Sequence, residues 1–293
     1  MNTSLTMAGA WLITPPRAGR FDSALRACPD VALLDLEDSV RTESKDAARV
    51  AALAYLNARR GQDEGVLTGL RINSPGTVHG LKDLAAIADS GVCDAVVLVP
   101  KVESARDIDL VSQALDAERQ RLSVWALIET PRAILRLDAV LATAQLQGVV
   151  FGAADYAAAT GCRTSAKALL WARSALAAGA AAAGIPAIDS PYFDLDDADG
   201  LRTHAEEARE LGYAGKGAVH PDQLPIIREA FSPTAAEIAA ARAIVAAADE
   251  AGGDMTRAGG HMVGPPLVAA ARALLARTTK TLQASNPQEA ADE

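Results

Sequence analysis

The sequence predicts an α/β protein whose main domain closes into a TIM (β/α)8 barrel. First, short apolar runs alternate with helix-like stretches along residues 1–232, as in LLDLEDSV and VWALIETP. Second, most of these runs are apolar throughout, which is typical of parallel strands buried on both faces. Third, each run closes on one or two polar residues, and eight such strands joined by right-handed helical crossovers close most simply into a barrel. A doubly wound open sheet is the alternative.

The expected elements follow one another along the barrel domain. The stretch 42–59 opens on a Ser/Thr cap with early acidic residues and has apolar spacing near 3.6, which indicates a helix. Pro131 suits the first turn of another helix. Strands are expected at 11–14, 31–37, 67–73, 95–101, 123–129, 148–152, 185–189 and 217–219. Helices are expected at 20–27, 42–59, 77–89, 104–119, 131–144, 165–183, 196–211 and from 221 onward.

The last part of the chain, residues 233–293, predicts a helical arm or lid. A capped helix follows Phe231, the loop GGDMTRAGGHMVGPP comes next, and a second helix is expected at 267–277. Residues from Gln283 onward are polar and are expected to fray. No Gly/Ser linker precedes this arm, so we expect it to dock on a barrel, either its own or a neighbour's.

Composition excludes several functional classes. The 293 residues carry a net charge of −9 and only 4% aromatic residues, which argues against a diffuse nucleic-acid surface and against base stacking. Cys28, Cys93 and Cys162 form no CxxC pair, which fits reduced thiols and makes structural zinc improbable. The N-terminus lacks a basic n-region, and the alanine-rich stretch 175–188 is interrupted by a glycine and a proline. We expect a cytoplasmic protein without membrane or nucleic-acid partners.

Polar residues close the predicted strands, and the carboxyl ends of barrel strands meet at one mouth. Glu129 and Asp155 follow adjacent strands, so their carboxylates could converge on a hard cation such as Mg²⁺; alternatively, each caps the helix after it. The residues expected to share this mouth are Asp35, Glu37, Asp38, Arg71, Lys101, Glu129, Asp155, Asp189 and His220.

Two basic residues of this set have distinct expected roles. Arg71 can grip a carboxylate or enolate oxygen through two parallel hydrogen bonds, or it can pair with the acidic run DLED at 35–38. Lys101 could neutralise the same acids or act as a nucleophile; because the surrounding acids would keep it protonated, we favour an ion pair.

The remaining candidates are weaker. Asp189 and Ser190 could line a substrate or thioester channel or form a turn. His220 could cap a helix or shuttle protons. Arg17 and Arg20 could meet the phosphates of a nucleotide-like ligand or lie in a solvated loop. The sequence has no GxGxxG after a strand, no P-loop and no GxSxG, so those classes lack their signatures.

Taken together, these motifs resemble the HpcH/HpaI aldolase/citrate lyase β-subunit family, in its branch that acts on CoA thioesters such as malyl-, citramalyl- and citryl-CoA. The similarity covers nearly the whole chain, from TPPRAGRF through LLDLEDSVRTESKDAAR, LRINSPG, LVPKVESA, IETPRA and FGAADYAA to AGIPAIDSPYFDLDDADGL and LGYAGKGAVHPDQL. The resemblance implies a TIM barrel, homo-oligomers such as trimers or hexamers, and acyl-CoA and small ketoacid substrates. It also implies Mg²⁺ held by residues that match Glu129 and Asp155.

The resemblance implies roles for further residues. Arg71 would bind the oxygen of the ketoacid or enolate, while Glu37 and Asp38 would orient water in the outer shell of the metal. The related small pyruvate aldolases carry histidine at the place of Asp38, so Asp38 favours the CoA-thioester branch. Arg17 and Arg20 loosely match the basic loop near the CoA phosphates, although a lysine often found a few residues later is absent. Independently of the resemblance, we expect Lys101 and Asp189 to lie at the substrate site.

One departure from the family pattern bears on the reaction. Family members that cleave the carbon–carbon bond commonly have a C-terminal motif like M-V-D-x-P, whose aspartate serves as acid/base in a neighbouring subunit's site. This chain has Gly264 at the place of that aspartate. Losing a general acid or base typically costs about 10²–10⁴-fold in rate. The implied function is a 3-hydroxyacyl-CoA lyase; the alternatives are a CoA-thioester hydrolase and a non-catalytic ligand-binding homologue.

Overall fold

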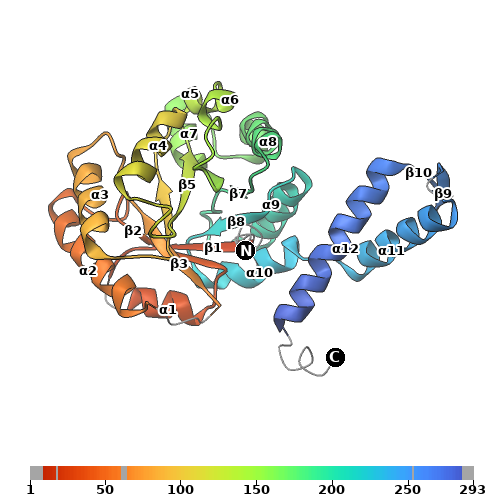
Figure 1. The fold of residues 1–293 in the computed structure, drawn as a ribbon, viewed down its shortest axis with the longest axis horizontal. Coiled ribbons are helices and arrows are strands. Elements are labelled where there is room, and N and C mark those ends of the chain that lie inside the picture. Colours follow the sequence, from red (N-terminus) through yellow and green to blue (C-terminus); the bar gives the residue numbers. More distant parts are fainter. Residues whose placement is uncertain (1–8, 18, 61–64, 253, 286–293) are drawn as a thin grey trace. The chain divides into compact units, whose positions relative to one another are not determined.

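The barrel predicted from the sequence is confirmed by a computed structural model, which describes residues 9–17, 19–60, 65–252 and 254–285. The chain forms two compact units, Met1–Phe231 and Ser232–Glu293. In the first unit, eight parallel strands pair in sequence order, and β1 also pairs with β8, so the sheet closes (Figure 1). The open-sheet alternative is therefore wrong. The strands are β1 (Gly9–Thr14), β2 (Val31–Asp35), β3 (Leu67–Arg71), β4 (Val96–Val99), β5 (Ser123–Ile128), β6 (Gly148–Phe151), β7 (Ala187–Asp189) and β8 (Gly215–Ala218).

Helices follow the strands and surround the barrel (Figure 1). They are α1 (Arg20–Arg26), α2 (Lys45–Ala58), α3 (Val78–Ser90), α4 (Ala105–Ala114), α5 (Pro131–Ile134), α6 (Leu137–Val140), α7 (Ala153–Thr160), α8 (Ala166–Ala183), α9 (Ala198–Glu210) and α10 (Leu224–Phe231), with 3-10 turns at Thr42–Ser44 and Pro221–Gln223. The helix expected at 131–144 is divided into α5 and α6, and α7 was not predicted as a separate helix.

Alternation along the strands separates two apolar layers. Val31 and Leu33 of β2 belong to a cluster inside the barrel, where Trp11 and Trp125 lie with ring centroids 4.5 Å apart. Ala32 and Leu34, the neighbours in sequence, belong to the larger cluster between the strands and the helices. Successive strand residues point to opposite faces, so a side chain's parity along its strand decides whether it faces the barrel axis or the helices.

The second unit pairs two helices through a hairpin. Helices α11 (Ala235–Glu250) and α12 (Pro265–Ser285) pack against each other. The segment expected to be a loop instead contains the antiparallel strands β9 (Thr256–Ala258) and β10 (His261–Val263). Gly259 and Gly260 both have positive φ, 58° and 84°, which is what a two-residue type I′ hairpin turn requires.

Two further expectations concern the polar tail and the presence of a membrane span. The polar tail expected from Gln283 lies partly in α12 and partly outside the described residues. Among the helices that the structure describes, none combines the length and apolar character needed to cross a bilayer.

Candidate active site

Six of the predicted site residues meet at the carboxyl ends of neighbouring strands. Asp35, Glu37, Arg71 and Glu129 share the parity of residues that face the barrel axis, such as Leu33 and Leu127. Their side chains therefore leave the apolar interior at its top and enter the mouth. The carboxylate cluster, as we call this group, consists of Glu37 and Asp38 after β2, Arg71 at the end of β3, Lys101 after β4, Glu129 after β5 and Asp155 in the first turn of α7.

Arg71 is fixed by a buried acid beside it. Its Nε and Nη2 atoms donate to the two carboxylate oxygens of Asp35, both at 2.7 Å. Its remaining nitrogen, Nη1, donates to Asp38 at 3.4 Å and lies 3.2 Å from Glu37 Oε2, with which it makes no hydrogen bond. Burial alone would raise the pKa of Asp35, but the hydrogen bonds and charge of Arg71 outweigh burial and lower it. Asp35 thus holds the guanidinium with Nη1 turned toward the cluster.

Lys101 stands among three acids of the cluster. Its Nζ atom lies 3.2 Å from Glu37, 3.7 Å from Glu129 and 3.4 Å from Asp155. Its backbone takes a left-handed conformation, with φ of 55°, and its N–H donates to Glu129 Oε1 at 2.8 Å. Despite the opposing effect of burial, the charges of Glu129 and Glu37 raise the pKa of Lys101. The geometry therefore agrees with the ion pair favoured from the sequence.

The raised pKa keeps Lys101 as an ammonium group near neutral pH, whereas a Schiff-base nucleophile requires a free amine. We predict that incubation with pyruvate and borohydride leaves the mass of the intact protein unchanged between pH 7 and 9. A pyruvate-derived adduct on Lys101 in the mass spectrum would contradict this assignment.

Glu129 is the most perturbed acid of the cluster. It is 1% exposed, and burial together with the nearby charge of Glu37 raises the pKa of Glu129 to about 8. Burial also raises the pKa of Glu37, whose buried Oε2 atom finds no hydrogen-bond partner among the residues that the structure describes. Gly152 makes room for this arrangement, because a Cβ there would collide with the side chain of Glu129. Crowded carboxylates of this kind favour a bound cation.

The donors suit a hard cation held by few protein ligands. Within the described part of the chain, no three His, Cys, Asp or Glu side chains converge as a metal cage. Glu129 and Asp155 instead offer carboxylate oxygens to the same ammonium group, that of Lys101. Mg²⁺ is commonly bound through one or two carboxylates, with water and substrate oxygens completing its shell. The residues present therefore fit Mg²⁺ and fit no thiolate- or imidazole-rich metal site.

Asp189 does not join the cluster, contrary to the expected place at the mouth. It is fully buried, and it accepts hydrogen bonds from Arg173 at 3.1 Å and from Lys216 at 2.8 Å. Its neighbour Ile188 faces the barrel axis, so Asp189 points outward to the helices. Arg173, Lys216 and His204, which complete this buried network, were missed by the sequence reasoning. Lys216, a charged residue within the otherwise uncharged strand GKGA, was the sequence signal that could have pointed to this network.

The other candidates lie apart from the cluster or act locally. His220 accepts a hydrogen bond from the backbone N–H of Asp222 at 3.3 Å and caps the short turn before α10, which was one of its two expected roles. Arg17 and Arg20 are exposed after β1 and at the start of α1. Their placement leaves them accessible to a ligand.

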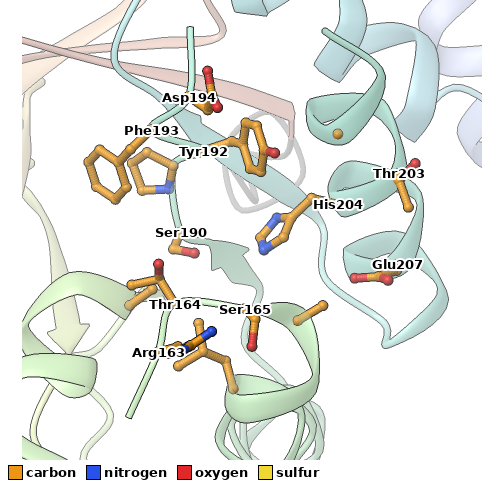
Figure 2. Close-up of a pocket in the computed structure, with 15 residues that line it drawn as sticks. Arg163, Thr164, Ser165, Ser190, Tyr192, Phe193, Asp194, Thr203, His204 and Glu207 are labelled. Atoms are coloured by element: carbon orange, nitrogen blue, oxygen red, sulfur yellow. The ribbon is translucent and has the colours of Figure 1, made fainter. Parts of the chain in front are cut away.

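A separate cavity of about 570 Å³ opens between α8, α9 and the loop after β7. We call it the α8–α9 pocket (Figure 2). Ala153 and Leu169 come from α7 and α8, and Ser190 lies directly after Asp189. Its lining residues are Ala153, Arg163, Thr164, Ser165, Ala166, Leu169, Ser190, Pro191, Tyr192, Phe193, Asp194, Gly200, Thr203, His204 and Glu207. None of the six cluster residues is among them.

Comparison with known proteins gives consistent similarities. Residues 18–221 match the sequence model of the HpcH/HpaI aldolase/citrate lyase family. The citrate lyase subunit beta of Haemophilus influenzae is 31% identical over 262 residues, which cover 85% of this chain and 89% of that protein. The L-malyl-CoA/beta-methylmalyl-CoA lyase of Rhodobacter capsulatus is 30% identical, with coverages of 80% and 82%.

A solved structure shows the same similarity over nearly the full length. The protein CitE of Mycobacterium tuberculosis, in complex with magnesium, acetoacetate and coenzyme A, is 32% identical to this chain. The two align with a TM-score of 0.79 over 93% of this chain and 99% of that one.

Proposed function

Because the chain belongs to the HpcH/HpaI aldolase/citrate lyase family, we propose that it is a Mg²⁺-dependent lyase that cleaves the carbon–carbon bond of a 3-hydroxyacyl-CoA thioester. The single observation that carries the proposal is the convergence of Glu129, Asp155 and Arg71 at one mouth, where contacts through Glu37 and Lys101 link them. Malyl-, citramalyl- and citryl-CoA are the substrates that we propose to test. A relative named as a malyl-CoA lyase and a similar structure containing magnesium and coenzyme A support this class.

Glu129 and Asp155 would hold the metal through carboxylate oxygens. When bound, Mg²⁺ supplies Lewis-acid polarisation of the ketoacid carbonyl. Lys101 would balance the negative charge that remains on Glu37 and its neighbours. Glu37 and Asp38 would orient water around the site, because no group in the described part of the chain hydrogen-bonds to Glu37 Oε2.

Arg71 would bind the oxygen on which negative charge develops. Asp35 engages two of its nitrogens and leaves Nη1 directed at the cluster, so the donor is positioned before substrate arrives. Such preorganised donors stabilise an enolate without reorganisation at the moment of reaction. Arg17 and Arg20 would meet the CoA phosphates from the exposed end of β1.

The proton transfer is the step that this chain must perform without the usual aspartate. In the second unit, Gly264 lines a cavity of about 400 Å³ that Asp254 also lines. Asp254, or water held by the acids of the cluster, could carry the proton; the side chain of His261, a third candidate, lies outside what the structure describes. A CoA-thioester hydrolase is the second candidate function, and Gly264 is the observation that favours it.

Thiol release separates the two functions. A lyase converts a 3-hydroxyacyl-CoA into a shorter acyl-CoA and a ketoacid and frees no thiol, whereas a hydrolase frees the thiol of CoA. We expect Mg²⁺-dependent formation of ketoacid with no rise in free thiol. Stoichiometric thiol release without ketoacid would assign the hydrolase instead.

Introducing an aspartate at position 264 tests whether the missing acid limits the rate of the lyase reaction. Among the described residues, a Cβ added at Gly264 meets only the Met255 side chain, at an ordinary contact distance of 3.8 Å, so the Cβ of an aspartate is accommodated. We predict that Gly264→Asp raises the lyase kcat by about 10²-fold or more, the usual effect of a positioned general acid. The measurement is ketoacid formation under saturating thioester, with Gly264→Asn as the control that cannot carry the proton. An equal gain in the asparagine variant would contradict the proton-transfer explanation.

Metal affinity should depend on pH because a cation must displace the proton of Glu129. Since the pKa of Glu129 is raised to about 8, the Mg²⁺ association constant should rise by up to about tenfold per pH unit below pH 8 and level off above it. Calorimetric titrations at pH 6, 7, 8 and 9 measure this rise. A flat profile would contradict the assignment of Glu129 as a metal ligand.

A further inference from the structure

The α8–α9 pocket holds a polar atom that the fold itself does not satisfy. Ser190 is 1% exposed, yet its Oγ atom has no hydrogen-bond partner among the described residues. Figure 2 shows the Ser190 side chain between Thr164 and Ser165 on one side and His204 on the other. Leaving a buried hydroxyl unpaired costs free energy, so such a group calls for an explanation in terms of a ligand or water.

The buried network behind the pocket fixes a second donor. Lys216 Nζ lies 2.6 Å from His204 Nδ1 and also donates to Asp189 and to the carbonyl oxygen of Ser190. Because Lys216 also donates to Asp189, we assign it as an ammonium group, which has no acceptor, and Nδ1 of His204 as the acceptor. Burial first and the charge of Lys216 second lower the pKa of His204 to about 3. The imidazole is therefore neutral at pH 7, and its single N–H is on Nε2.

The start of α8 adds positive potential on the same side. This helix has 18 residues, and its N-cap residue Ser165 makes no side-chain capping hydrogen bond. The first N–H groups of such a helix attract anions. Arg163 lines the same wall, just before Thr164 and Ser165 (Figure 2). The unpaired hydroxyl of Ser190 and the start of α8 are thus two independent features of one pocket wall, and both favour a bound anion.

The remaining walls limit what else the ligand can contain. Leu169 and Phe193 are apolar, so they favour a short hydrocarbon body. Asp194 lies toward the opposite end of the view in Figure 2 from Arg163 and Thr164. A carboxylate there would repel a second anionic group and accept a hydrogen bond from a hydroxyl. A volume of about 570 Å³ falls within the range of small-molecule sites.

We propose that the α8–α9 pocket binds a small hydroxycarboxylic acid at a site distinct from the carboxylate cluster. The carboxylate of the ligand accepts hydrogen bonds from Ser190 and His204 and lies at the start of α8. Its apolar body lies against Leu169, and its hydroxyl donates to Asp194. None of the six cluster residues lines this pocket, so we expect the acid to bind there without the metal of the proposed lyase site.

Ser190→Ala is the decisive variant because it removes only the unpaired hydroxyl. We expect the melting temperature to stay the same or rise, since no hydrogen bond within the protein is lost. We expect the affinity for 3-hydroxybutyrate to fall roughly 10- to 100-fold, as when one hydrogen bond to a charged group is lost. Ser112→Ala is the matched control: Ser112 is buried elsewhere, with its hydroxyl donating to Gln145 at 3.0 Å, and should leave the affinity unchanged.

The binding experiment uses the full-length protein in EDTA, with saturation-transfer NMR and calorimetry. The probes are 3-hydroxybutyrate, butyrate and inorganic phosphate. We expect 3-hydroxybutyrate to bind more tightly than butyrate, Asp194→Asn to shrink that difference, and Glu129→Gln to change nothing. The last variant separates this site from the proposed metal site, so the two proposals can fail independently.

Four results would overturn the inference. The first is that neither acid binds. The second is an affinity unaffected by Ser190→Ala, which would mean that water alone occupies the site. The third is a loss of binding in Glu129→Gln, which would place the acid at the carboxylate cluster. Tighter binding of phosphate than of both acids would likewise reject the carboxylic-acid class.

Discussion

Glu129→Gln is expected to reduce Mg²⁺-dependent turnover on the order of 10³-fold or more. The substitution keeps the size of the side chain but removes the charge of a carboxylate oxygen that we assign to the metal. A bound cation contributes several kcal/mol of charge stabilisation, and about 1.4 kcal/mol corresponds to a factor of ten in rate. Calorimetry should show a matching loss of Mg²⁺ affinity, and ketoacid formation measures the turnover.

The same substitution should stabilise the metal-free protein at high pH. Because the pKa of Glu129 is about 8 in the folded protein and near 4.3 when unfolded, the folded state binds more protons between these values. The free energy of unfolding therefore decreases as pH rises through this window, by up to about 1.4 kcal/mol per unit, and Glu129→Gln should remove that slope. Glu103→Gln, near Arg132 and half-buried, is the control that should preserve turnover and slope. Full activity in Glu129→Gln would reject the metal assignment.

Arg71→Lys is expected to lower kcat/KM of the lyase reaction by about 10²-fold or more. Lysine keeps the positive charge but cannot bind both oxygens of Asp35 while pointing another donor at the cluster. Loss of one preorganised donor at a developing oxyanion typically costs about 10²–10³-fold in kcat. Steady-state kinetics with the cleaved thioester measures this effect.

A second pair of variants separates the catalytic role of Arg71 from its structural one. Arg71→Met leaves the buried Asp35 without its counterion and should lower the free energy of unfolding by about 3–5 kcal/mol. Adding Asp35→Asn should restore much of that stability without restoring activity. Arg121→Lys, in an exposed pair with Asp94, is the control and should leave the stability nearly unchanged, because exposed ion pairs contribute little. Recovery of activity in the double variant would show that Arg71 acts only through the fold.

The barrel could be predicted because its sequence pattern is strong. Fully apolar runs spaced by helices leave few ways to bury both faces of each strand, and a closed parallel sheet does so. The ends of the strands were predicted less well. Glu37, Asn73, Lys101 and Glu129 were included in strands but lie beyond them, because their polar side chains belong to the turns at the mouth.

The position of Asp189 shows that a polar residue at the end of a strand does not always lie at the barrel mouth. Arg71 and Glu129 do lie there, because their parity along the strand directs them to the barrel axis. Asp189 follows inward-facing Ile188, so alternation directs it outward to Arg173. Counting parity along each run would have made this distinction from the sequence. The distances within the buried network could not be predicted, because they depend on how α8 and α9 pack against β7 and β8.

The glycines of the second unit carried a signal that the sequence reasoning did not use. Gly259 and Gly260 stand between two three-residue strands, which is the pattern of a two-residue hairpin. The short strands lack an apolar alternation of their own, so the segment was expected to be a loop.

Mg²⁺-dependent lyase activity is tested most directly by mass spectrometry of malyl-, citramalyl- and citryl-CoA incubated with the protein in Mg²⁺ or in EDTA. We predict that at least one thioester yields equal amounts of a shorter acyl-CoA and a ketoacid, and only with Mg²⁺. Intact thioesters in every reaction, or products that form equally in EDTA, would contradict this prediction.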